Sequence, residues 1–336
     1  MTLRPRAPTV SRSATAKPWR HASGGYGGSR QGPPILNLPP SEVIVASLAR
    51  DRRQVAGDLV ALTKPRVVVM ILVTTLVGYY VGLIGAPDYV RMLHLMIGTV
   101  LAAGGTLALN QYWERAIDAR MERTRMRPLP DGRLQPIEAL LFGGAITLVG
   151  VLYLAAFVTA LSALVTAATA VLYLFVYTPL KVRTALCTIV GAVPGALPPV
   201  TGWVAARDDL ALGAWVLFGI LFLWQLPHTL AIARLYRDDY ARAGVRVLPV
   251  VDAEGSTTER QIVTAGLALL AVSLLPTLIG LAGGLYFAGA LVLGVTQAVL
   301  GGMQALAPSA TSARRVLYAS LLYLPALLAL LAFDKI

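Results

Sequence analysis

The sequence is poor in charged residues and in cysteine. Of its 336 residues 14% are charged and 56% hydrophobic, whereas an average soluble domain has roughly 25% charged residues. This balance is atypical of a water-soluble enzyme. Its single cysteine, Cys187, has no partner for a disulfide within the chain and excludes cysteine-rich zinc or iron–sulfur sites.

Acidic residues are absent from residues 1–41, which carry six basic residues and a stretch rich in glycine, serine and proline. Such a composition has little capacity to bury a core and predicts a disordered cytoplasmic tail. An organelle transit peptide is the alternative, because such peptides are also basic and poor in acid. We expect residues 1–60 to form this tail and residues 61–336 to form one membrane domain.

Long uncharged runs make up most of the remaining chain, and about 20 apolar residues span the hydrocarbon core of a bilayer. The runs cover 67–86, 92–109, 139–180, 185–203, 210–233, 261–313 and 316–333. Two of them have the length of two helices, and we divide these near Phe157–Val158 and Gly283–Gly284. None alternates with the period of two that a membrane barrel needs. The predicted fold is therefore an all-α membrane protein with nine transmembrane helices in one bundle.

Lysine and arginine gather in alternate connections between these runs, which sets the expected orientation. The N-terminus is predicted in the cytoplasm and the C-terminus outside, with cytoplasmic acidic loops capping a central cavity. The amino-acid composition, rich in Ala, Gly, Arg and Leu, favours a bacterial plasma membrane. A mitochondrial inner membrane is the alternative. The net charge of +12 then reflects topology, and nucleic acid is not an expected partner.

The first charged connection combines carboxylates with arginines. Asn110, Glu114 and Asp118 are four residues apart, so on a helix they share one face. Oxygen ligands of this kind suit Mg²⁺, which proteins hold with one or two carboxylates plus substrate phosphates. Arg123, Arg125 and Arg127 follow and are suited to gripping phosphate oxygens. The pattern predicts a diphosphate site, and the alternative is a solvated helix end with ordinary charge pairs.

A second charged segment follows the sixth predicted helix on the same side of the membrane. Asp238 and Asp239 supply its carboxylates, so the two segments together have the composition to hold one anionic substrate. His228 lies near the end of the preceding apolar helix, where an ionisable residue is a functional candidate. Binding heme iron, moving a proton, and hydrogen-bonded packing are its three interpretations.

Several motifs, in this order, resemble the intramembrane aromatic prenyltransferase superfamily. They are Lys64-Pro65-Arg66, the run from Asn110 to Leu129 with its Arg-Thr-x-x-Arg-Pro-Leu ending, Tyr177-Thr178-Pro179-Leu180-Lys181, the Gly- and Pro-rich run 191–203, Trp224-Gln225-x-Pro227-His228, and Asp238-Asp239-Tyr240. The last two motifs look like the branch of the family that modifies heme. The Gly- and Pro-rich run is interpreted either as tight helix packing or as the wall of a cavity.

The resemblance implies a nine-helix enzyme that uses Mg²⁺ to draw diphosphate from farnesyl diphosphate and joins the farnesyl group to heme b. It assigns Asn110, Glu114 and Asp118 to a first metal–diphosphate motif and Asp238 and Asp239 to a second. Diphosphate contacts are implied for Arg123 and Arg127, and for Lys181, Lys64 and Arg66 as further candidates. The chain departs from the family at Glu114, where aspartate is usual, and the longer side chain puts the metal geometry there in doubt.

Three rival functions stay open at this stage. A related prenyltransferase acting on 4-hydroxybenzoate or a naphthoate would share the diphosphate chemistry. A nine-helix transporter would carry its ionisable residues at mid-membrane, whereas these carboxylates gather at helix ends. A non-enzymatic heme-handling protein would keep its role without the acids. The resemblance also implies the lipid bilayer as surroundings and heme A synthase or terminal-oxidase assembly factors as candidate protein partners.

Overall fold

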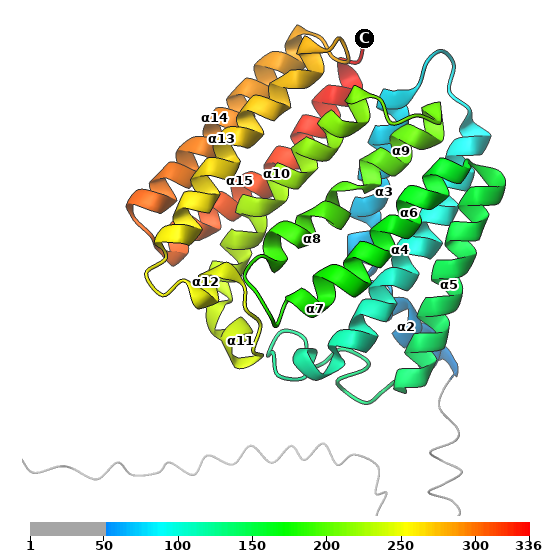
Figure 1. Cartoon of the computed structure of the whole chain (residues 1–336), viewed down its shortest axis with the longest axis vertical. Helices are drawn as coiled ribbons and strands as arrows, with labels where there is room; N and C mark the ends of the chain where they lie inside the picture. The colour runs from blue at the N-terminus through cyan, green and yellow to red at the C-terminus, as the bar shows by residue number, and fades with distance from the viewer. Residues whose placement is uncertain (1–51) are drawn as a thin grey trace, which may run out of the picture. The chain divides into compact units, whose positions relative to one another are not determined.

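The computed structural model describes residues 52–336, so the predicted tail lies outside the described residues except for its last nine. Within this range the structure is a bundle of long helices (Figure 1). The helices are α2 (Arg52–Leu62), α3 (Pro65–Gly82), α4 (Tyr89–Asp118), α5 (Pro136–Phe157), α6 (Ala160–Val171), α7 (Thr178–Leu180), α8 (Cys187–Ala196), α9 (Pro198–Arg207), α10 (Leu212–Leu235), α11 (Arg237–Arg242), α12 (Leu248–Val251), α13 (Ser256–Leu278), α14 (Gly284–Leu306) and α15 (Ala310–Phe333).

Nine spans in residues 52–336 are long and apolar enough to cross a membrane, which confirms the predicted number. The two divisions are also confirmed. Thr159 caps α6 by accepting a hydrogen bond from Ser162 N at 3.0 Å, directly after α5 ends. Gly283 is the residue that precedes α14. The predicted boundary after residue 60 falls inside α2.

Two spans differ in detail from uninterrupted helices. The fourth continues from α6 through a π-helical segment, Leu172–Tyr177, into α7. The fifth is broken between α8 and α9 at Leu197, because Pro198 and Pro199 supply no backbone N–H for a continuous helix. The π-helical segment ends directly before α7 and Lys181, and π-helical turns often occur at functional sites.

α4 is the longest helix, with 30 residues, which corresponds to about 45 Å and exceeds the thickness of the hydrocarbon core. The sequence predicted its apolar part only as far as residue 109. The helix continues because its polar end is buried: Gln111 Nε2 donates a hydrogen bond to the carbonyl of Leu62 at 2.6 Å. Asn110, Glu114 and Asp118 therefore lie on one helix.

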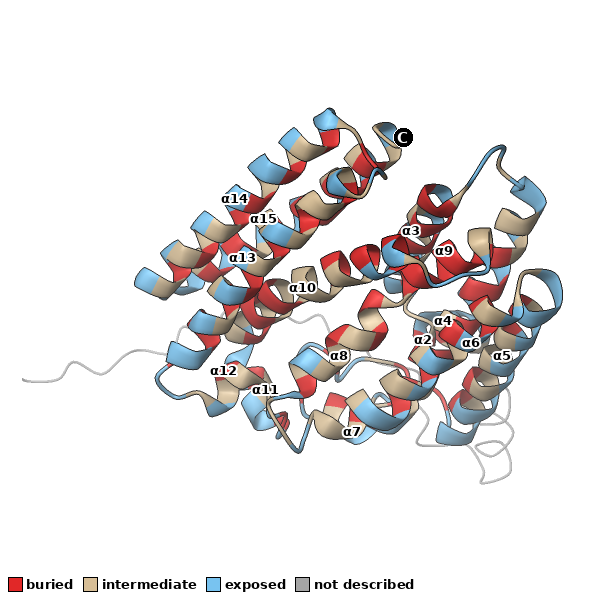
Figure 2. Ribbon diagram, turned by 45° about the horizontal axis from the view of Figure 1, so that its top comes forward, coloured by how far each residue is buried: buried red, intermediate tan, exposed pale blue. Residues whose placement is uncertain are grey.

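Side chains that face outward are largely apolar, as a lipid environment requires. Figure 2 shows exposed residues along the outer sides of α14 and α5, and they include Leu141, Leu148, Val292 and Val299. The main core cluster lies between α9, α10, α13, α14 and α15, with Trp203, Leu217 and Tyr323 almost fully buried. α3 packs against α9, and α4 against α5.

The α3–α9 contact depends on two glycines. A Cβ atom at Gly202 would lie 1.9 Å from the carbonyl oxygen of Thr75, and one at Gly78 would lie 2.0 Å from that of Pro199. Backbone therefore touches backbone, a contact that small residues permit in membrane helices. The packing interpretation of the Gly- and Pro-rich run is confirmed at Gly202.

We expect Gly202→Ala to lower the stability of the bundle by about 1–3 kcal/mol, because the added methyl group forces α3 and α9 apart. Thermal unfolding of the purified protein in detergent measures the change. Gly144→Ala is the matched control, because a Cβ there meets nothing within 4 Å. Equal melting temperatures for the two variants would contradict the close backbone contact.

The connection before α13 supplies a pH-dependent contact. Asp252 Oδ2 accepts hydrogen bonds from Thr258 N at 2.7 Å and Thr258 Oγ1 at 2.8 Å. Burial opposes the charge of Asp252, but these hydrogen bonds outweigh it and lower the pKa of its carboxyl below the ordinary 3.8.

Because the folded state lowers this pKa, the stabilisation is present above about pH 4 and is lost as the pH falls through the lowered value. We expect Asp252→Ala to destabilise the protein by about 1 kcal/mol at pH 7 and to flatten the acid side of its stability curve. Melting temperatures between pH 3 and pH 7 test this. A variant whose curve parallels the unmodified protein at all pH values would contradict it.

Candidate active site

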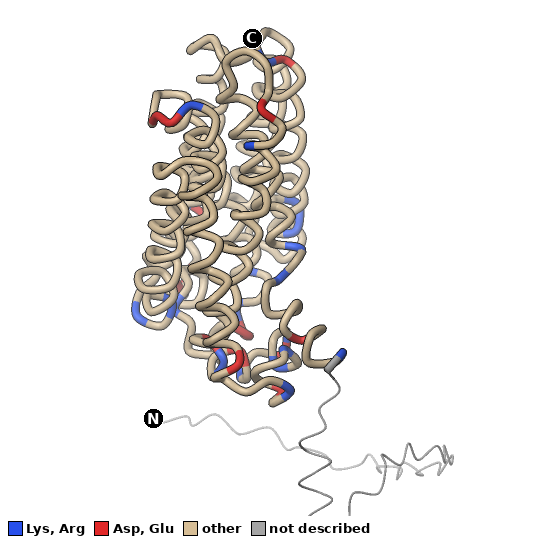
Figure 3. The backbone as a smooth tube through the Cα atoms, turned by 90° about the vertical axis from the view of Figure 1, so that its right-hand side faces the viewer, with Lys and Arg blue, Asp and Glu red and all other residues tan. Residues whose placement is uncertain are grey.

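Charged residues concentrate at one end of the bundle (Figure 3). The end of α4, the connection that follows it, the residues after α7 and helices α11 and α12 meet there. Met121 of the first connection packs in one apolar cluster with Ala243 and Val245, and Arg246 N donates a hydrogen bond to the carbonyl of Lys181 at 2.7 Å. The apolar cluster and the backbone hydrogen bond thus hold the three polar connections together.

The three predicted ligands on α4 are all buried. Their exposed fractions are 0% for Asn110, 6% for Glu114 and 1% for Asp118. A charge-rich helix end in solvent would leave such side chains exposed, so the alternative of an ordinary solvated face does not describe them. Buried carboxylates require partners, and each residue of this face has one.

Each partner is a basic side chain from a different segment. Lys64 Nζ donates to Asn110 Oδ1 at 3.1 Å, Lys181 Nζ lies 2.6 Å from Glu114 Oε1, and Arg127 Nη1 donates to Asp118 Oδ2 at 2.7 Å. We call these six residues the α4 cluster. It holds three cationic groups against two carboxylates, so it has basic capacity to spare for an anionic ligand.

Lys64 occupies an unusual backbone position at the start of α3. Its φ of 51° and ψ of 66° lie in the left-handed region, which costs a non-glycine residue on the order of 1 kcal/mol and is frequent at functional sites. Burial, together with the charges of Arg127 and Lys181, lowers the pKa of Lys64 to about 7. A bound anion would favour the protonated lysine.

Lys181 is held on two sides. Its Nζ lies 4.5 Å from the centroid of the Tyr177 ring as well as beside Glu114. Burial opposes the lysine charge, but Tyr177 and Glu114 outweigh it and raise the pKa of Lys181 well above its ordinary value. Lys181 is therefore a permanent cation of the cluster.

The sequence did not single out a role for Thr178. Its Oγ1 accepts a hydrogen bond from Asn110 Nδ2 at 3.1 Å and donates to the carbonyl of Tyr173 at 2.8 Å. This pair of contacts orients the amide so that Oδ1 faces Lys64. Since the two residues are 68 positions apart, no local pattern reveals the contact.

Asp239 of the second segment joins the two acidic connections through a hydrogen bond. Its Oδ1 accepts hydrogen bonds from Glu122 N at 2.9 Å and Arg242 Nη2 at 2.7 Å. Burial opposes its charge, but these donors outweigh it and hold the pKa of Asp239 below its ordinary value. Asp238 is exposed, and both aspartates line a hollow of about 470 Å³ that we call the α10–α11 hollow.

The remaining predicted residues lie apart from the α4 cluster. Arg123 is exposed, with its guanidinium 5.7 Å from the centroid of the Tyr236 ring in the α10–α11 hollow. Arg66 is exposed on the first turn of α3, and no ion pair joins it to other described residues. His228 Nδ1 is 2.9 Å from Ser320 Oγ, and its ring stacks on Trp224.

The donor set of the α4 cluster fits a hard cation. Two carboxylates and one amide oxygen on successive turns match the oxygen ligands of Mg²⁺. No group of three His, Cys, Asp or Glu side chains in residues 52–336 forms a complete metal site, so a metal there needs further oxygens. A substrate diphosphate supplies such oxygens.

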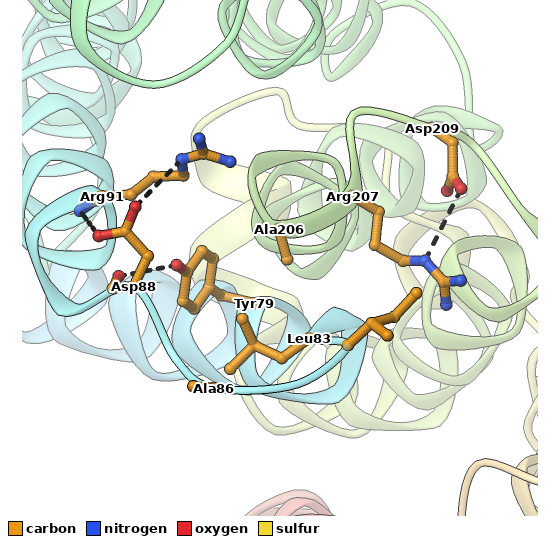
Figure 4. Close-up of a pocket in the computed structure, with 9 residues that line it drawn as sticks. Tyr79, Leu83, Ala86, Asp88, Arg91, Ala206, Arg207 and Asp209 are labelled. Atoms are coloured by element: carbon orange, nitrogen blue, oxygen red, sulfur yellow. Dashed lines mark hydrogen bonds and ion pairs between the residues drawn. The ribbon is translucent and has the colours of Figure 1, made fainter.

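A hollow of about 440 Å³ lies at the other end of α3 and α9 (Figure 4). Its charges are neutralised in local pairs, Arg91 with Asp88 and Arg207 with Asp209, each at 3.7 Å. Tyr79 donates a hydrogen bond to the carbonyl of Asp88 at 2.8 Å. None of the residues of the α4 cluster lines it.

A nine-span helical bundle with buried carboxylates and surplus cations at one end defines the class of intramembrane prenyltransferases. The chain belongs to this class as a member of the UbiA prenyltransferase family, whose model matches residues 71–324. The family membership confirms the resemblance that the motifs indicated.

Among curated proteins, the chain is 49% identical over 287 residues to the protoheme IX farnesyltransferase of Solibacter usitatus, covering 83% of this chain and 98% of that protein. Among solved structures, digeranylgeranylglyceryl phosphate synthase has a TM-score of 0.72 at 15% identity, over 83% of this chain and 98% of that one. A UbiA homolog from Archaeoglobus fulgidus bound to DMAPP and Mg²⁺ has a TM-score of 0.61 at 14% identity, over 82% and 99% of the two chains. These structural similarities confirm the fold.

The Glu114–Lys181 pair offers a test of the buried cluster, because its side chains are 8% and 18% exposed. We expect Lys181→Met to destabilise the protein by about 3–5 kcal/mol, since it leaves a carboxylate buried without its cation. The double variant Glu114→Gln with Lys181→Met should recover most of that loss. Thermal unfolding in detergent of the two single variants and the double variant measures the coupling, and strictly additive losses would contradict a buried pair.

Proposed function

We propose that this protein transfers the farnesyl group of farnesyl diphosphate to a vinyl group of heme b and releases diphosphate. The observation that carries the proposal is the α4 cluster, in which two buried carboxylates and an amide stand beside three basic side chains. The relative named protoheme IX farnesyltransferase, which is 49% identical and matched over 98% of its length, supports heme b as the acceptor.

The bond that breaks joins C1 of the farnesyl group to the diphosphate oxygen, and its electron pair leaves with the diphosphate. Lys64, Lys181 and Arg127 would donate hydrogen bonds to the leaving oxygens and offset the developing negative charge. Asn110, Glu114 and Asp118 would hold Mg²⁺, with Asp238 and Asp239 as a second set of ligands. The metal, when bound, supplies further positive charge at the diphosphate.

Lys181 neutralises Glu114 and Arg127 neutralises Asp118, while Lys64 donates to the neutral amide of Asn110. With Mg²⁺ held by Glu114 and Asp118, the side chains of Lys181 and Arg127 would be free to donate hydrogen bonds to the diphosphate oxygens. The Glu114 side chain is one methylene longer than that of aspartate. Its Oε1 lies 2.6 Å from Lys181 Nζ. Arg66 lies one residue beyond Pro65 and contributes only long-range positive charge.

The allylic cation left at C1 is attacked by the vinyl π-electrons of heme b, which forms the new carbon–carbon bond. The resulting cation beside the porphyrin ring takes up water and releases a proton, giving a hydroxyethylfarnesyl side chain. The helix bundle keeps bulk water from the first cation, because the outer surface of the spans is apolar and the backbone is satisfied within the helices.

The polar end of the bundle is the cytoplasmic end in this proposal, with the N-terminus inside and the C-terminus outside a bacterial plasma membrane. The concentration of basic residues at that end supports the orientation (Figure 3). Residues 61–336 then form the catalytic membrane domain, and α2 anchors its entry through the contact of Leu62 with Gln111.

Expression in a host that lacks its own heme-farnesylating enzyme tests the function. We expect mass analysis of extracted hemes to show farnesylated hydroxyethyl heme with the unmodified protein, and at least a hundredfold less with Asp118→Asn or Asp238→Asn. Asp208→Asn is the matched control, because Asp208 is exposed in the connection at the other end of the bundle.

Comparable amounts of each variant in the membrane, with unchanged melting temperatures, are needed for the comparison. Absence of modified heme with well-folded unmodified protein would overturn heme as the acceptor. Labelled prenyl diphosphates with 4-hydroxybenzoate or a naphthoate would then identify an aromatic acceptor instead.

A further inference from the structure

The α10–α11 hollow contains cations that the diphosphate chemistry does not use. It has a volume of about 470 Å³ and lies between the end of α10, the start of α11 and the connection that follows α4. Asp239 and Glu122 line it and are hydrogen-bonded to each other through the Glu122 backbone. Glu122 follows Asp118 by four residues, so a short connection joins the hollow to the α4 cluster along the chain.

Most charges around the hollow are already paired. Arg234 binds Glu259 at 3.0 Å, Arg242 binds Asp239 at 2.7 Å, and Glu122 pairs with Arg125. Two lining guanidiniums, those of Arg123 and Arg237, have no carboxylate partner among residues 52–336. Asp238 is the lining carboxylate without a cation among residues 52–336, and the proposed function places it on a metal ion.

The hollow and His228 lie on the same face of α10. Leu235 lines the hollow and follows His228 by seven residues, so the two share a face of α10 and are separated by about 10 Å along its axis. Ser320 Oγ donates its hydrogen to the carbonyl of Leu317 at 2.6 Å, so it accepts from His228 Nδ1–H. This assignment leaves the lone pair of Nε2 available.

A porphyrin such as heme b is amphiphilic, with two propionate carboxylates on one edge and its vinyl groups on other edges. Carboxylates placed within an apolar bundle are costly, whereas a pair of arginines without carboxylate partners among residues 52–336 binds them through charge-assisted hydrogen bonds. An acceptor held in this way would extend from the hollow along α10 toward His228, with its ring beside the neighbouring α4 cluster.

We propose that the α10–α11 hollow is the subsite for the two carboxylates of the porphyrin acceptor, with Arg123 and Arg237 as their partners. The proposal rests on the proposed function for the identity of the acceptor. The resemblance implied a diphosphate contact for Arg123. In this proposal Arg123 binds the acceptor instead. Arg127, four residues later in the same motif, stays with the diphosphate through its contact with Asp118.

Binding of zinc protoporphyrin IX and of its dimethyl ester to the purified full-length protein tests the subsite without farnesyl diphosphate. Fluorescence titration in detergent should show at least tenfold tighter binding of the diacid than of the diester. Arg237→Ala and Arg123→Ala should each weaken diacid binding roughly tenfold and leave diester binding unchanged. Arg237→Lys should restore part of the loss, and Arg260→Ala, an exposed arginine of α13 outside the hollow, should have no effect.

Steady-state kinetics then separate the two substrates. We expect Arg237→Ala and Arg123→Ala to raise the KM for heme b and to leave that for farnesyl diphosphate within twofold. Equal binding of diacid and diester by the unmodified protein, or arginine variants that keep the unmodified diacid-to-diester ratio, would overturn the subsite. An increase in the KM for farnesyl diphosphate with Arg123→Ala would overturn the role of that residue. Failure of the proposed function appears separately, as absence of farnesylated heme.

Discussion

Burial of charge within an apolar bundle is the constraint on which the polar end of this protein depends. A carboxylate taken out of water costs several kcal/mol unless a cation and hydrogen bonds accompany it. Glu114 and Asp118 satisfy this requirement with Lys181 and Arg127, while Asn110 is held between Lys64 and Thr178. The partners come from before α3, after α4 and after α7. The same contacts that stabilise the carboxylates therefore hold three connections in place.

The second acidic segment has a different physical role. Asp239 accepts from the backbone of Glu122 and from Arg242, so it acts as a fastening between the connection after α4 and helix α11. Asp238, next to it, is exposed in the α10–α11 hollow. Two adjacent aspartates of one motif thus have distinct surroundings, and Oδ2 of Asp239 accepts neither of these two hydrogen bonds.

The packing of the helices places these connections. Glycines at the α3–α9 contact let the two helix backbones touch. This contact fixes the position of α3 and therefore of Lys64, which directly precedes it. The break at Leu197 allows α8 and α9 to follow different directions. α10 carries His228 and Trp224 against α15, where Ser320 binds both: its Oγ is bonded to His228, and its carbonyl accepts a hydrogen bond from Trp224 at 2.7 Å. The polar connections at the bundle end thus join helices that pack against one another deeper in the bundle.

The fold class, the nine spans, their two divisions and the common face of Asn110, Glu114 and Asp118 can all be read from the amino-acid sequence. They can because a bilayer demands long apolar helices and because helix periodicity is local. Which cation pairs with which acid, the orientation of Asn110 by Thr178, and the different surroundings of Arg123 and Arg127 emerge from the folded bundle. Those contacts join residues as far as 68 positions apart, and they follow from helix packing, which short-range sequence patterns do not encode.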